Sequence, residues 1–169
     1  MSEEDHRSFR RDPGVAALQP VDENTLVPWE GGRLLHAWWF RARGAREMPA
    51  RSDFEPRVMG RHLAGITLHD VLPEEPRFRV RLVGSDFVEV LGYDPTGMWV
   101  ADLPGGAPLV ERYRWMVANR RPYMALDLPL RWANRDYDSY STLVMPLSSD
   151  GREIDMLIAH VDVRPAWRR

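Results

Sequence analysis

"RFRVRLVGSDFVEVLGYDPTG", residues 77–97, is the stretch of this sequence that decides its fold. At its start, arginines alternate with Phe78, Val80 and Leu82, which is the period of a β-strand with one buried and one solvated face. We expect these three apolar side chains to face the core and the arginines to face outward. The alternative is a basic stripe that binds phosphates, but the alternation alone is what a half-buried strand requires.

A short helix follows this strand, and a second strand precedes it. The helix, "DFVEVLG", has Ser85 or Asp86 as its expected N-cap and Gly92 at its end. Upstream, "AGITLHDVL", residues 64–72, has strand character and is joined by the turn "EEP", so the two strands are expected to form a hairpin. Downstream, Pro108 suits the first turn of a longer helix, "PLVERYRWMVANR".

The rest of the chain supplies one more helix and three more strands. "GGRLLHAWWFRARG" predicts a helix with an aromatic stripe that ends at Gly44, and "YMALDLPLRW", "DSYSTLVMPL" and "EIDMLIAHVDV" predict strands. The order predicts an α+β domain with a mostly antiparallel sheet. We divide the chain into a flexible N-terminal tail (1–28), a helix and connector (29–61), a core (62–164) and a C-terminal tail (165–169). A docking arm is the alternative for the first segment.

Composition narrows the class of protein. With 169 residues and 44% hydrophobic content, the chain can close one core. Its net charge of -2 provides no overall attraction to nucleic acid or to an anionic membrane. The first residues, "MSEEDHRSFRRD", lack the apolar run of a secretion signal, and no stretch is apolar for long enough to span a membrane. We therefore expect a cytoplasmic protein that binds neither nucleic acid nor membranes.

The segments "LLHAWW", "MPARSDFEP", "ITLHDV" and residues 77–97, together with the three closing strands, resemble the PAS (Per-Arnt-Sim) domain family, and specifically its short single-domain bacterial members. The resemblance extends over Arg33–Val163. It implies a five-stranded antiparallel sheet of spatial order 2-1-5-4-3, with small helices enclosing a pocket on one face. It also implies an N-terminal amphipathic helix on the other face that often makes a dimer contact.

Aromatic and methionine side chains are the candidates for a ligand site in that pocket. An apolar lining with a few polar groups suits a small molecule, and methionine adapts to varied shapes. The sequence does not separate a lined cavity from a filled core. The expected lining residues are Phe87, Leu91, Trp99, Tyr113, Met116, Trp132, Tyr140, Met145 and Met156. For helix docking or dimer formation we expect Leu34, Leu35, Trp38 and Trp39.

No catalytic or metal-binding motif is present. The 5 histidines lack the paired spacing of a zinc site, although His69 and His160 lie in strands expected to be neighbours. The helix after Pro108 contains no histidine, which argues against haem as it is bound in PAS sensors. The count of 0 cysteines excludes flavin photochemistry through a cysteine adduct. The cofactor is unknown, and we expect no metal site.

The resemblance implies a sensor or protein-interaction module in signal transduction. We expect it to bind a small apolar ligand, to form a homodimer and to act through a separate effector protein. One alternative is a small enzyme in which His69, Asp70 and Asp155 perform acid–base catalysis. Another is nucleic-acid binding through Arg77, Arg79 and Arg81, which the near-neutral charge disfavours.

Overall fold

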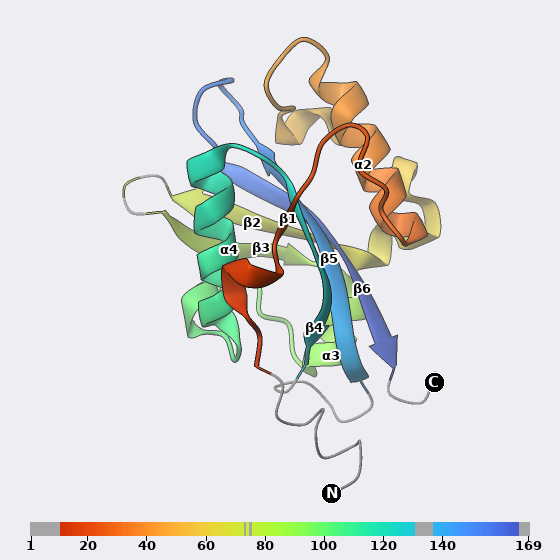
Figure 1. The fold of residues 1–169 in the computed structure, drawn as a ribbon, viewed down its shortest axis with the longest axis vertical. Coiled ribbons are helices and arrows are strands. Elements are labelled where there is room, and N and C mark those ends of the chain that lie inside the picture. Colours follow the sequence, from red (N-terminus) through yellow and green to blue (C-terminus); the bar gives the residue numbers. More distant parts are fainter. Residues whose placement is uncertain (1–10, 73, 75, 131–136, 166–169) are drawn as a thin grey trace, which may run out of the picture.

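One antiparallel sheet runs through the computed structural model, which describes residues 11–72, 74, 76–130 and 137–165 (Figure 1). Its strands lie in the order β1-β4-β5-β6-β2-β3. The strand bounds are β1 (Gln19–Pro20), β2 (Ile66–Leu72), β3 (Arg77–Val83), β4 (Tyr123–Pro129), β5 (Tyr137–Leu147) and β6 (Met156–Pro165). When the five longer strands are numbered along the chain, their order is the expected 2-1-5-4-3.

The sixth strand, β1, extends the sheet beyond the expected five. It pairs with β4 through Gln19 opposite Met124 and Pro20 opposite Tyr123. Proline has no N–H to donate, and at the edge of a sheet this costs little. The pairing was not foreseen because two residues around a proline carry no strand periodicity.

Helices cover both faces of the sheet. In Figure 1, α2 (Glu30–Arg43) lies on one side, and α4 (Gly106–Asn119) lies on the other. The short helix α3 (Ser85–Leu91) is on the same side as α4, because Phe87 of α3 and Tyr113 of α4 line one cavity. Short 3₁₀ segments join these elements: η1 (Gly14–Ala17), η2 (Arg51–Asp53), η3 (Pro56–Gly65) and η4 (Val100–Asp102).

The aromatic stripe of α2 packs on its own sheet. Leu35, Trp38 and Trp39 are buried, and the Trp39 indole N–H donates to the Pro146 carbonyl of β5 at 2.8 Å. Leu34 is only half-buried. Each large apolar side chain buried in this way contributes about 2–3 kcal/mol to the free energy of unfolding. The expected docking of this helix on the sheet is thus present, whereas its role in a dimer stays a prediction.

Strand β3 departs from the expected alternation at its end. Phe78 and Val80 are buried as expected, but Leu82 is 46% exposed. The register against β2 shifts between Leu68 and His69, so that Arg81 is an extra residue in β3. Such a bulge turns the following side chains to the opposite faces. Val83 therefore lines the cavity, and the expectation that Leu82 faces the core was wrong.

Helix α3 begins without a side-chain cap. Gly84 occupies the N-cap position, and no side-chain hydrogen bond caps the helix, so the expected role of Ser85 or Asp86 as the cap was wrong. Both residues lie inside the first turn. Glycine is needed here for space, because a Cβ at Gly84 would lie 2.1 Å from the Ala64 carbonyl oxygen.

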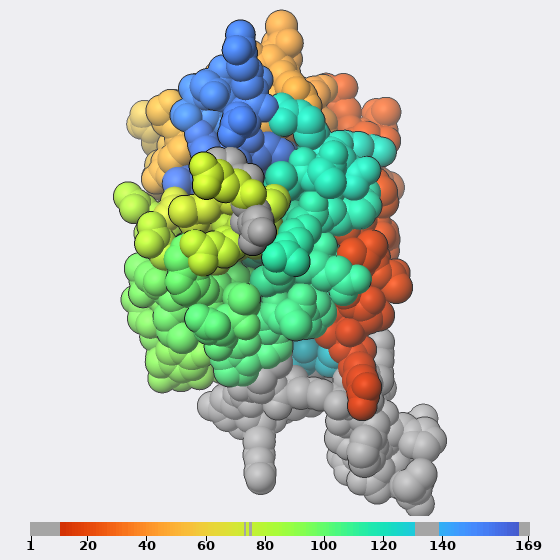
Figure 2. Space-filling view, turned by 90° about the vertical axis from the view of Figure 1, so that its left-hand side faces the viewer, coloured from red at the N-terminus to blue at the C-terminus, as the bar shows by residue number. Residues whose placement is uncertain are grey.

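Residues 11–28 lie against the domain, although a flexible tail was expected there. Val21 and Val27 are buried, and η1 contacts α4. Figure 2 shows this segment as a continuous strip beside α4. Its contacts join residues that are far apart in the chain, so no local periodicity in the sequence predicts them. Among the described residues, no helix is long and apolar enough to cross a membrane.

Candidate ligand-binding cavity

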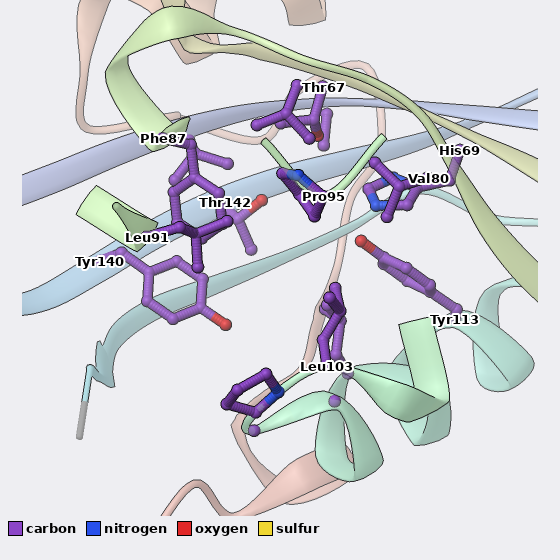
Figure 3. Close-up of a pocket in the computed structure, with 17 residues that line it drawn as sticks. Thr67, His69, Val80, Phe87, Leu91, Pro95, Leu103, Tyr113, Tyr140 and Thr142 are labelled. Carbon is purple, nitrogen blue, oxygen red and sulfur yellow. The ribbon is translucent and has the colours of Figure 1, made fainter. Parts of the chain in front are cut away.

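A cavity of about 50 Å³ lies between the sheet and the helices α3 and α4. Strands β2, β3, β5 and β6 form its floor through alternate residues, including Thr67, Val80 and Thr142. Leu103 and the start of α4 close the other side (Figure 3). One water molecule needs about 10–15 Å³ of such space, so the cavity has room for about three to five water-sized positions.

His69 is the most unusual residue of the cavity wall. It is 5% exposed, and its Nδ1 atom meets no hydrogen-bond partner among the described residues. Burial lowers the pKa of His69 to about 4, so the imidazole is neutral near pH 7. A buried polar atom without a partner costs about 1–3 kcal/mol, so this imidazole lowers the stability of the cavity wall.

Tyr113 of α4 stands beside His69. The two ring centroids are 5.3 Å apart, and in Figure 3 the Tyr113 hydroxyl points toward the imidazole. Burial raises the pKa of Tyr113 well above its usual value, so the hydroxyl keeps its proton. A neutral imidazole and a phenol thus form the polar end of a mostly apolar cavity.

The other end of the cavity leads toward the surface. His69, Val80 and Tyr113 are buried, whereas Phe87, Leu91 and other lining residues at α3 and the start of α4 are half-buried. The cavity is therefore deepest at the imidazole and is least covered at the side of α3 and the start of α4.

The structure brings together four of the nine expected lining residues: Phe87, Leu91, Tyr113 and Tyr140. Met116 is fully buried in the core and is not part of the wall. Met145 and Met156 point away, because Val144 of β5 and Leu157 of β6 occupy the cavity-side positions in the alternation. Trp132 lies outside the described residues.

Trp99 lies at the outer edge of β3 and not in the cavity. The guanidinium groups of Arg77 and Arg79 sit over its ring, 4.3 and 5.5 Å from the centroid. These two outward arginines thus pack on an aromatic ring, as cation–π pairs do. The strand interpretation of residues 77–83 accounts for them without a phosphate.

Thr67, Thr142 and Val161 also line the cavity but were not expected there, whereas Val80, which was expected to face the core, lines it as well. The sequence contains a pattern that could have indicated Thr67 as a neighbour of His69, because the two residues are two positions apart in "ITLHDV" and so share one face of the strand.

His69 and Asp70 are consecutive in that strand and therefore face opposite sides of the sheet. Asp155 accepts hydrogen bonds from the backbone N–H and hydroxyl of Ser149. The three residues named for the alternative enzyme do not share a site.

His160, in the strand beside His69, faces the other side of the sheet. Its Nδ1 accepts from the Trp29 indole N–H at 2.9 Å, and its Nε2 donates to the His62 carbonyl at 3.1 Å. Burial lowers the pKa of His160 to about 4. His160 thus holds the start of α2 on the sheet. Because His69 and His160 face opposite sides of the sheet, they do not contact each other.

A buried ion pair connects the N-terminal segment to the cavity wall. Arg112 of α4 is 0% exposed and donates two hydrogen bonds to the Asp12 carboxylate, at 2.5 and 3.0 Å. It also donates to the Tyr140 hydroxyl at 3.4 Å. Burial on its own would lower the pKa of Arg112, but the Asp12 hydrogen bond raises it overall. The contacts run without a break from the cavity through Tyr140 and Arg112 to Asp12.

In the part of the chain that the structure describes, no group of three or more histidine, aspartate or glutamate side chains is arranged to hold a metal ion.

Comparisons with curated proteins and with solved structures found no match. A family model for the PAS domain matches residues 29–112, from the start of α2 to the ion-paired Arg112. The strand order and this match agree, and the chain belongs to the PAS domain family.

Proposed function

We propose that this chain is a sensory module that binds a small molecule between its sheet and the helices α3 and α4. The observation that carries the proposal is the buried His69, whose Nδ1 has no partner among the described residues and which lines the cavity. A filled core would serve stability better with an apolar residue here, because the unpaired nitrogen costs free energy. Membership of the PAS family supports the same interpretation.

The N-terminal segment is the element we propose to respond to binding. A molecule in the cavity would contact Tyr140, whose hydroxyl accepts from Arg112, and Arg112 holds Asp12. A shift of the Tyr140 ring therefore alters the environment of a buried ion pair. The free energy of local opening differs between parts of a protein and is lowest in segments with few buried contacts.

A separate effector protein and a homodimer complete the proposal. The buried face of α2 is already covered by the sheet, so a dimer would use another surface. Light scattering after size exclusion measures the oligomeric state directly. The expectation that the chain is not an enzyme stays a prediction.

Native mass spectrometry of the protein purified from its source cell tests ligand binding. We expect a mass increment that disappears when the protein is denatured. The matched control is Ala159→Val, since Ala159 is 1% exposed and lines the cavity, and valine is favourable in strands. The added methyl groups occupy the cavity, so this variant should fold and carry no increment. An increment of equal size on both proteins would contradict the proposed site.

A further inference from the structure

The chemistry of the cavity wall defines which kind of molecule it can take, provided that the proposed sensory function holds. The described residues that line it carry no charged group, because His69 is its only basic residue and is neutral in its buried position. The buried charge that contacts the lining residue Tyr140, Arg112, is already neutralised by Asp12. A charged molecule would lose its hydration here and find no opposite charge.

Size sets a second limit. A cavity of about 50 Å³ is far smaller than the roughly 300–1,000 Å³ of sites that hold drug-sized ligands. With about 10–15 Å³ for each water-sized position, it admits about three to five non-hydrogen atoms. Large cofactors do not fit this space.

Hydrogen bonding sets the third limit. A neutral imidazole offers Nδ1 as an acceptor or as a donor, according to its tautomer. The Tyr113 hydroxyl beside it can donate and accept. A hydroxyl or amide group, which does both, can hydrogen-bond the imidazole in either tautomer, whereas a hydrocarbon cannot.

We propose that the cavity binds an uncharged molecule of about three to five non-hydrogen atoms, whose hydroxyl or amide group hydrogen-bonds the His69 imidazole. The polar group lies beside the adjacent rings of His69 and Tyr113. The apolar end extends past Val80 toward Phe87 and Leu91, where the wall is hydrocarbon (Figure 3).

Three probes of one shape and size test the limits on charge and on hydrogen bonding separately. Acetamide, acetate and isobutene are flat, three-branched molecules with four non-hydrogen atoms, and they are respectively neutral and polar, anionic, and apolar. Titration of the full chain is followed by the ring nitrogen signals of His69 and the methyl signals of Val80. The best small ligands gain about 1.5 kcal/mol per non-hydrogen atom, so dissociation constants should be no tighter than tens of micromolar.

We expect acetamide to bind at least about fivefold more tightly than isobutene or acetate, the ratio expected from one hydrogen bond to a neutral group. The His69→Leu variant should lose that preference and still bind isobutene, which also shows that the variant is folded. The control is His36→Leu, because His36 bonds the Asp22 carbonyl on the surface and lines no part of the cavity. It should bind all three probes as the parent does.

The outcomes separate this inference from the proposed function. If isobutene or acetate binds most tightly, or if His69→Leu keeps the preference for acetamide, the inference is overturned while the sensory cavity stands. If none of the three probes gives saturable shifts at these signals, the cavity takes no small molecule and both proposals are overturned.

Discussion

Two buried histidines, His69 and His160, lie on neighbouring strands and differ in what they touch. Both of the His160 ring nitrogens have partners, so its role is structural. The Nδ1 atom of His69 meets none among the described residues. The sequence predicted both residues to lie in adjacent strands. The face of the sheet that each side chain occupies depends on its position in the alternation along the strand, and a register shift of one residue reverses that face.

Acid should destabilise the protein through these two residues. Burial lowers the pKa of each to about 4 from 6.5, so the unfolded chain binds more protons than the folded one between these pH values. The free energy of unfolding is therefore not reduced by these histidines above pH 6.5, and it falls by about 3 kcal/mol for each histidine as the pH falls toward about 4. Urea unfolding measured from pH 7.5 to 4 follows this loss.

His69→Leu removes one of the two contributions. The free energy of unfolding of this variant should therefore fall about half as steeply between pH 6.5 and 4. An unchanged slope would mean that the imidazole is already exposed to water in the folded state.

At the scale of elements, the strands and helices follow local patterns, but the N-terminal segment does not. The period-two alternation of β3 is visible in residues 77–80 and fails only at the bulge. The docking of η1 on α4 depends on Asp12 and Arg112, which are 100 residues apart. Arg112 lies within an apolar stripe of the helix. The Asp12 carboxylate that compensates its buried charge is identified by the structure and not by any pattern in the sequence.

This ion pair can be compared with a second one of the same chemistry. Glu47 accepts two hydrogen bonds from Arg120, at 2.7 and 3.0 Å, but both side chains of that pair are partly exposed to water. Asp12→Asn should lower the free energy of unfolding by about 3 kcal/mol, because it leaves the Arg112 charge buried without a partner. Glu47→Gln should cost less than about 1 kcal/mol.

Denaturant unfolding of both variants measures the difference. Equal costs for the two substitutions would show that the N-terminal segment already exposes Arg112 to water in the folded parent. Asp12→Asn should also make the segment Gly14–Ala17 more open to proteolysis, whereas Glu47→Gln should not.

For the whole molecule, strand order was predictable from the sequence, and the state of the cavity was not. The order 2-1-5-4-3 is what the resemblance to the PAS family implies, whereas the elements taken alone predict only a mostly antiparallel sheet in an α+β domain. The cavity depends on how side-chain volumes add up across six elements, and that sum has no sequence pattern. Four expected lining residues are in place, and the two methionines on the wrong face, Met145 and Met156, show how much depends on the phase of each strand.

Amide hydrogen exchange tests most directly whether cavity binding is sensed by the N-terminal segment. With acetamide at ten times its dissociation constant, we predict about tenfold slower exchange in β2, α4 and residues 14–20. Tyr140→Phe should keep the protection of α4 and lose that of residues 14–20, because it removes the hydroxyl that Arg112 contacts. Protection in none of these segments, or equal protection of residues 14–20 in both proteins, would contradict the account.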